Sequence, residues 1–198
     1  MRRLGVIIIV GLLLAVMPST IVLAMPDSIT VPETSVTIVI DGSLNMTSEW
    51  NGSAIVVWTN PLDGEEYDNV YMLHNDTHYL FAAALYDPDP VDDDSFTLYV
   101  KWGNITYKYV LSEGSSTIEL YNITDGEVAL SSNGTAVMTS SSPSQSWLYV
   151  ELAIPKSEWN SSTTVYALFV HKHTFKIDTT SKYPEAANVS DPSTWLEV

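Results

Sequence analysis

The sequence contains no cysteine. Disulfides, thiolate metal sites and thiol nucleophiles are therefore excluded, and the folded chain has to depend on its hydrophobic core. A chain of 198 residues is long enough to bury a core of ordinary size. Serine is abundant, but the Gly-x-Ser-x-Gly elbow of hydrolases is absent, and no two carboxylates are set apart as acid and base by an apolar setting. We therefore expect that the protein is not an enzyme.

Basic side chains are also scarce. The chain has 8 Lys and Arg against 24 Asp and Glu, which gives a formal net charge of −16, and its two arginines are Arg2 and Arg3. Because phosphate groups are neutralised by clustered Lys and Arg, a nucleic-acid partner is excluded, and an anionic membrane surface is disfavoured for the same reason. Such a charge favours solubility and the binding of cations.

The N-terminal segment has the pattern of a secretory signal. A Met-Arg-Arg start precedes an almost unbroken apolar run over 4–16, and Val-Leu-Ala provides a cleavage site after Ala24. This pattern predicts a signal peptide over residues 1–24. The alternative is a retained membrane anchor, since the apolar run is nearly long enough to span, but Pro18 interrupts it. We expect a secreted, extracellular protein of the cell surface, which contacts a membrane only through this segment if it stays uncleaved.

After the signal, the chain shows no long helical period. Short segments rich in Val, Ile, Thr and Tyr are bounded by Gly, Asn, Asp, Ser or Pro, which is typical of strands. In the segment 95–102, apolar side chains alternate with polar ones, and the segment 148–154 shows the same pattern. The pattern predicts an all-β sandwich or barrel. The expected strands are 35–41, 53–60, 70–76, 79–87, 95–103, 105–114, 116–122, 135–141, 146–155 and 164–177, and one helical turn is expected at 155–159.

No repeat or second composition class divides the remaining sequence. Residues 25–35 contain two prolines and read as an extended N-terminal arm, and residues 36–198 read as a single domain that ends in a loop and a short closing segment. Asp41-Gly42 is expected to form a tight turn in which glycine supplies a positive φ.

Asn-x-Ser/Thr sequons are unusually dense for one small domain. Eight of them suggest a sugar coat on an exposed protein, although a Ser-, Thr- and Asn-rich composition also produces such triplets passively. The predicted N-glycosylation sites are Asn45, Asn51, Asn75, Asn104, Asn122, Asn133, Asn160 and Asn188.

An acidic loop joins two of the expected strands. Grouped carboxylate oxygens suit calcium, which takes six to eight oxygen ligands and also relieves the repulsion between the aspartates. The alternative is a solvated acidic turn in which one Asp caps backbone amides. The candidate calcium ligands are Asp87, Asp89, Asp92, Asp93 and Asp94.

Three blocks of the sequence are similar to those of a known family. "IDGSLNMTSEW" (40–50), "LHNDTHYLFAAALYDPDPVDDDSFTLYVKWG" (73–103) and "LYVELAIPKSEW" (148–159) resemble, in order and spacing over 36–175, the family 9 carbohydrate-binding modules and the related DOMON-like secreted domains. The resemblance implies a two-sheet antiparallel β-sandwich, with Trp50 in the core. It leaves function open, because that superfamily includes sugar binders and haem b carriers.

This fold would bury one large core between its two sheets, since the chain has no disulfide to help it. From the alternation and the resemblance, the expected core residues are Trp50, Phe81, Phe96, Leu98, Val100, Leu152, Ile154 and Phe169.

The resemblance also directs attention to possible ligands. Sugar binding requires an exposed aromatic platform, and the candidates are Trp58, Trp102 and Trp147, together with several tyrosines that include Tyr71 and Tyr149. The family's sugar site is a pair of aromatic side chains that sandwich the sugar, and no pair here matches it by position. A haem b carrier would need axial ligands, and a zinc site would need paired histidines. The haem candidates are Met72, Met138, Lys101 and His171, and the histidine pairs are His74 with His78 and His171 with His173.

Two classes of function follow. The first is a non-catalytic secreted module that binds carbohydrate. The second is a self-assembling filament or coat subunit, in which the N-terminal arm adds as a strand to the sheet of the next copy.

Overall fold

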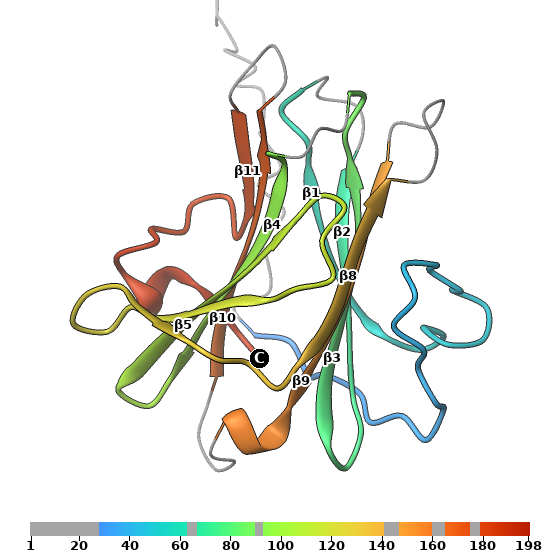
Figure 1. Ribbon diagram of the computed structural model, residues 1–198, viewed down its shortest axis with the longest axis horizontal. Helices are drawn as coiled ribbons and strands as arrows, with labels where there is room; N and C mark the ends of the chain where they lie inside the picture. The colour runs from blue at the N-terminus through green and yellow to red at the C-terminus, as the bar shows by residue number, and fades with distance from the viewer. Residues whose placement is uncertain (1–27, 63–66, 90–92, 141–146, 160–164, 175–178) are drawn as a thin grey trace, which may run out of the picture.

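The structure is a computed structural model that describes residues 28–62, 67–89, 93–140, 147–159, 165–174 and 179–198. These residues form two antiparallel β-sheets packed face to face, as Figure 1 shows. The predicted all-β sandwich is therefore confirmed. The predicted signal peptide, residues 1–24, lies outside the described residues.

The first sheet has five strands in the order β1-β2-β3-β9-β8, and every neighbouring pair is antiparallel. The central strand β3 therefore borders β2 on one side and β9 on the other. The strands are β1 (Ala54–Thr59), β2 (Tyr67–His74), β3 (His78–Tyr86), β9 (Trp147–Pro155) and β8 (Thr135–Ser140).

The second sheet has seven strands, six of them in the order β11-β10-β4-β5-β6-β7. The short strand β12 pairs with the beginning of β10, and β11 pairs with the rest of the same strand. The strands are β11 (Thr179–Tyr183), β10 (Val165–His173), β4 (Ser95–Trp102), β5 (Ile105–Ser112), β6 (Glu119–Asn122), β7 (Val128–Leu130) and β12 (Leu196–Glu197), and two 3-10 helices, η1 (Lys156–Glu158) and η2 (Pro192–Thr194), complete the described elements.

The core between the sheets follows from side-chain alternation. Along β4 and β9 the apolar side chains point inward and bring both sheets into one cluster of buried residues. Seven of the eight predicted core residues belong to this cluster, namely Phe81, Phe96, Leu98, Val100, Leu152, Ile154 and Phe169. The predicted helical turn at 155–159 is confirmed as η1.

Trp50, the eighth predicted core residue, is fully buried but not between the sheets. It packs with Leu73 and Leu80 on the outer face of the five-stranded sheet, where the loop that precedes β1 covers these side chains. Figure 1 shows this N-terminal segment, in blue, lying outside the sheet. The interpretation of Trp50 as a core residue is therefore confirmed, and its expected place between the sheets is wrong.

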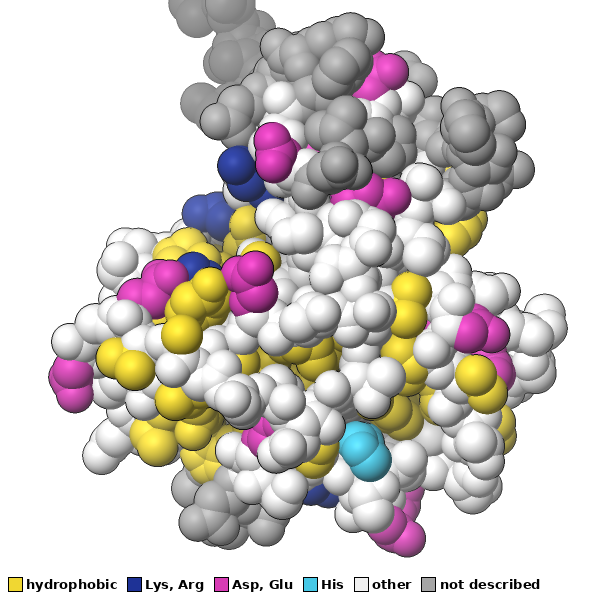
Figure 2. Space-filling view, viewed as in Figure 1, with side chains coloured by type: hydrophobic (Ala, Val, Ile, Leu, Met, Phe, Trp, Pro, Cys, Tyr) yellow, Lys and Arg dark blue, Asp and Glu magenta, His cyan; other side chains and the backbone are white. Residues whose placement is uncertain are grey.

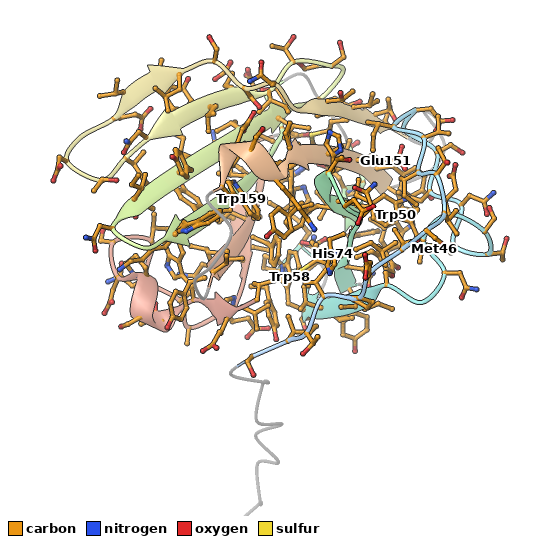
Figure 3. The ribbon with its side chains drawn as sticks, turned by 90° about the horizontal axis from the view of Figure 1, so that it is seen from below. Met46, Trp50, Trp58, His74, Glu151 and Trp159 are labelled. Atoms are coloured by element: carbon orange, nitrogen blue, oxygen red, sulfur yellow. The ribbon has the colours of Figure 1, made fainter. Side chains whose placement is uncertain are left out.

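Glu151 fastens this outer loop to the sheet. Its carboxylate is fully buried and accepts hydrogen bonds from Nε1 of Trp50 (3.0 Å) and from the backbone N–H groups of Asp41 (2.8 Å) and Gly42 (2.7 Å). Figure 3 shows Trp50 and Glu151 side by side where the loop crosses the sheet. Gly42 has φ +82°, as predicted for the turn, and a Cβ there would lie 2.9 Å from Oγ1 of Thr139.

The expected strand at 35–41 is not a strand in the structure. Its alternation is real, since Ile38 and Ile40 are half-buried against Trp50 while Val36 and Val39 are exposed. Alternating apolar and polar residues indicate that one side of a segment is buried. This segment buries its apolar side by lying across the outer face of a sheet, and it makes no strand pairing with that sheet. Strands β7 and β11 were missed, because β7 is wholly exposed and β11 is largely polar.

The N-terminal arm lies along one side of the sandwich and touches both sheets. The backbone N–H of Ile29 donates to the carbonyl of Glu197 (2.8 Å), and the N–H of His74 donates to the carbonyl of Pro32 (3.0 Å). The side chains of Ile29 and Val31 pack against the main core. Within this single chain, the arm therefore completes its own domain.

The surface carries the acidic charge as scattered groups. Figure 2 shows Asp and Glu side chains spread over the visible face. No helix among the described residues has the length and apolar character to cross a membrane. The predicted glycosylation sites Asn75 and Asn122 are half-buried, Asn160 lies outside the described residues, and those that are exposed are Asn45, Asn51, Asn104, Asn133 and Asn188. Their glycosylation stays a prediction.

Candidate functional site

A buried cluster of carboxylates and imidazoles lies at one end of the sandwich. Asp87 directly follows β3, Asp94 directly precedes β4, and His171 and His173 share the inward face at the end of β10. Nδ1 of His173 lies 2.9 Å from Oδ2 of Asp87 and 3.8 Å from Oδ1 of Asp94. Among the described residues, Asp87, Asp94 and His173 form a group that could hold a metal ion.

A second layer of hydrogen bonds surrounds Asp68, a fully buried carboxylate on β2. Its Oδ1 accepts from Nδ2 of Asn60 (2.9 Å) and from the backbone N–H of Tyr86 (2.8 Å). Its Oδ2 accepts from Oγ of Ser181 (2.5 Å) and lies 3.2 Å from Nδ1 of His171. Asp68 thereby fixes the orientation of the His171 ring.

The charges of this cluster support one another. Burial alone would raise the pKa of Asp87, but its interactions with the imidazoles of His171 and His173 outweigh the effect of burial and hold the pKa at about 2. Burial alone would lower the pKa of His171, but the neighbouring carboxylates of Asp68 and Asp87 raise it to about 9.

This geometry corrects the predicted calcium site. Of the five candidate ligands, Asp87 and Asp94 are brought together, fully buried. Asp93 is exposed and Asp89 half-buried, both outside the metal-holding group, and Asp92 lies outside the described residues. Asp87 and Asp94 are the two that lie next to the histidines of β10.

The predicted aromatic platforms are also corrected. Trp58 is 2% exposed and Trp102 is 8% exposed, and both belong to the main core. Both side chains occupy inward positions of their strands and pack in the core, so neither indole is open to a ligand. Trp147 is half-buried on the outer face of β9, with its ring edge-to-face against Tyr86 at 5.6 Å between centroids.

The outer face of the five-stranded sheet holds a different aromatic pair. Tyr71 on β2 and Tyr149 on β9 stand on either side of β3, where the intervening side chains are the small ones of Ala82 and Ala84. Tyr71, Tyr149 and Ala84 line a depression of about 460 Å³. We call this depression the tyrosine trough.

The loop that Glu151 fastens forms the other wall of the tyrosine trough. Gly42, Ser43 and Leu44 line it from one side, and Thr139 lines it from β8. Burial raises the pKa of Tyr71, and the neighbouring Tyr149 adds to the shift. The trough thus combines aromatic walls with hydroxyl and backbone groups, which is the composition of a small-molecule site.

A second cavity, of about 370 Å³, lies beneath the N-terminal arm. Ile29 and Val31 of the arm line it together with Phe81 and Trp159. Its lining is mostly apolar.

Comparison with known proteins supports the fold. No model of a known protein family matches the sequence, and no curated protein matches it. A family 9 carbohydrate-binding module from Caldicellulosiruptor kristjanssonii in complex with cellotriose is similar in structure, with a TM-score of 0.57 and 14% identity over 84% of this chain and 90% of that one. The chain has the fold of a family 9 carbohydrate-binding module. A structure of such a module from the same organism in complex with glucose gives a TM-score of 0.55 and 13% identity over 84% of this chain and 94% of that one.

The similarity confirms the predicted family 9 fold, and the tyrosine trough is the feature that sequence reasoning missed in it. Tyr71 and Tyr149 were among the aromatic candidates for sugar binding, but the sequence did not indicate that the two belong together. A signal was available, because both occupy outward positions of strands whose inward positions are apolar. Their pairing across β3 depends on strand order, which the sequence alone did not supply.

The haem and zinc candidates are dispersed. Met72 and Met138 are buried in the main core, and Lys101 lies on the outer face of β4, so these side chains and His171 do not share one pocket. His74 lies 3.3 Å from Nζ of Lys156, and Nδ1 of His78 lies 2.8 Å from a threonine hydroxyl. The pair His171 and His173 does share a strand face, as predicted.

Proposed function

We propose that this protein is a non-catalytic module that binds carbohydrate in the tyrosine trough. The observation that carries the proposal is the placement of Tyr71 and Tyr149 on the two strands that flank β3, where Tyr71 is level with Ala82 and Tyr149 with Ala84. Strands β2 and β9 are separated by about 9.6 Å and the two tyrosines are offset by about 6.8 Å along the strands, so their Cα atoms lie about 12 Å apart and leave room for a sugar ring. A sugar ring stacked on both sides at about 4 Å needs about 8 Å.

The surroundings of the trough favour neutral sugars. Stacking against tyrosine uses the apolar CH face of a sugar, and its hydroxyl groups need hydrogen-bonding partners nearby. Ser43, Thr139 and Ser140 line the trough and provide them. The net charge of −16 would repel an anionic polysaccharide, so uncharged glucans or similar chains fit better. The similar modules were solved with cellotriose and with glucose, both uncharged.

The proposal includes a place outside the cell. The apolar N-terminal segment and the eight sequons support secretion and a glycosylated cell-surface location. The exposed sequon residue Asn45 lies between Leu44 and Met46, which line the trough, so a glycan there would stand at its rim, whereas the other described sequon asparagines are not next to a lining residue in the sequence.

Replacing either tyrosine with alanine should weaken binding of cellotriose at least about 10-fold, equivalent to about 1.4 kcal/mol, as measured by isothermal titration calorimetry. Tyr121→Ala is the matched control, because Tyr121 lies on β6 of the other sheet and its hydroxyl bonds only to Glu119 among the described residues. Ala84→Phe should also abolish binding, because it fills the floor of the trough and leaves both tyrosines in place. Unchanged affinity in Tyr71→Ala, Tyr149→Ala and Ala84→Phe would refute the tyrosine trough as the sugar site.

The filament alternative rests on the N-terminal arm. The backbone bonds and the side chains of Ile29 and Val31 that hold the arm in its own domain could be supplied by the arm of another copy. If the protein is a carbohydrate-binding module, it should be a monomer both with and without residues 25–35. Removing these residues should lower the free energy of unfolding by about 2 kcal/mol, because two half-buried aliphatic side chains are lost. Electron microscopy and denaturant titration check both points. Fibres formed by the full-length mature chain and lost on truncation would establish strand donation instead.

A further inference from the structure

The buried cluster contains three carboxylates and two imidazoles. Asp68, Asp87 and Asp94 are all 0% exposed, and they face the two imidazoles of His171 and His173. Burying a carboxylate is costly unless it is paired or bound to a metal ion. Three buried carboxylates against two imidazoles leave room for a cation to complete the balance.

One atom of the cluster is unused. Among the described residues, Nε2 of His171 makes no hydrogen bond, although the side chain is 2% exposed. This nitrogen points at the cluster and lies 3.7 Å from Oδ2 of Asp87. The opposite nitrogen, Nδ1, faces Asp68 at 3.2 Å. A carboxylate behind one imidazole nitrogen leaves the other nitrogen oriented for a metal ion, which is the usual arrangement behind histidine ligands.

We propose that Asp87, Asp94, His171 and His173 bind one divalent transition-metal ion, with Zn²⁺ as the reference ion. In a tetrahedral site with bonds of about 2.0–2.2 Å, neighbouring ligand atoms lie about 3–4 Å apart. The donor atoms of Asp87, Asp94 and His173 all lie within 4.8 Å of one another, and Nδ1 of His173 lies 2.9 Å and 3.8 Å from the two carboxylates. Nε2 of His171 lies outside that group, 3.7 Å from Oδ2 of Asp87, and its ring would shift toward the ion to become the fourth ligand. Two imidazole nitrogens favour zinc or cobalt over calcium, which takes oxygen ligands.

The ion would join the two sheets. Asp87 ends the strand β3 of the five-stranded sheet, whereas Asp94 begins β4 and the histidines end β10 in the seven-stranded sheet. A metal bound by all four residues would therefore cross-link the sandwich at this end. In a chain without cysteine, it would supply a link that a disulfide supplies elsewhere.

The test uses the mature protein stripped with a chelator and dialysed. We expect micromolar Zn²⁺ to bind with one ion per chain and to raise the thermal midpoint, whereas Ca²⁺ at the same concentration leaves it unchanged. Co²⁺ should give the visible absorption of a tetrahedral site. Asp87→Asn and His171→Gln should lose the midpoint shift and the absorption, and Asp93→Asn, an exposed neighbour of the same charge, should keep both.

X-ray absorption of the zinc-loaded wild-type protein tests the ligand set without a variant that could fail to fold. Two imidazole nitrogens and carboxylate oxygens at about 2.0–2.2 Å are expected. A midpoint shift that persists in His171→Gln, a calcium response in place of a zinc response, or a spectrum without two imidazoles would each overturn the proposal.

Discussion

Replacing Glu151 with alanine should lower the free energy of unfolding by about 3–5 kcal/mol, among the largest effects of any single substitution in this protein. The carboxylate is fully buried, and the change removes all three hydrogen bonds that it accepts. The indole N–H of Trp50 and the N–H groups of Asp41 and Gly42 would then be left without their acceptor. Chemical denaturation followed by tryptophan fluorescence would measure the loss.

Glu151→Gln separates the shape of this side chain from its oxygens. Glutamine fills the same space, but its amide NH2 replaces one accepting oxygen and would face either Trp50 or the turn at Gly42. We expect a smaller loss than for alanine, about 1–3 kcal/mol. Both variants should also weaken sugar binding, because the loop that Glu151 fastens forms a wall of the tyrosine trough. Equal stability of both variants and the wild type would contradict the role given to Glu151.

The fold was largely predictable because burial leaves a period in the sequence. Leu98 and Val100 alternate with polar neighbours, and both are fully buried where the period placed them. The same reasoning misplaced Trp50 and the segment 35–41. A period of two in the sequence shows that one side of a segment is buried, but it does not show which part of the protein covers that side. The loop covers the outer face because Glu151 holds it there. Glu151 and Trp50 are 101 residues apart in the sequence, so their contact could not be predicted from local patterns.

The sites were predicted less well than the fold, for a related reason. The acidic loop suggested five oxygen ligands in a row, but Asp87 and Asp94 are the ones at strand ends, where the chain direction turns them inward to His173. The same strand order that pairs Tyr71 with Tyr149 across β3 is a long-range property. The residue types predicted which kinds of ligand the protein could bind, but the strand order determines which of these residues lie close together.

Asp68→Ala should cost about 3–5 kcal/mol of unfolding free energy, because it removes the nearer of the two carboxylates that pair with the buried His171. It also removes the acceptor for Asn60, Ser181 and the N–H of Tyr86. Thermal and denaturant unfolding of the metal-free protein would measure this loss. A cost below about 1 kcal/mol would show that Asp68 does not hold the network together.

Asp68→Asn keeps the shape and one accepting oxygen, so its loss of stability should be smaller, about 1–3 kcal/mol. Its effect on metal binding should nevertheless be clear, because the carboxylate at 3.2 Å from Nδ1 orients the ring whose Nε2 faces Asp87. Loss of such an orienting partner typically weakens metal affinity about 10–100-fold. Zn²⁺ titration against the Co²⁺ absorption, at a temperature where the variant is fully folded, separates this effect from stability. A variant that is destabilised but binds Zn²⁺ like the wild type would limit Asp68 to a structural role.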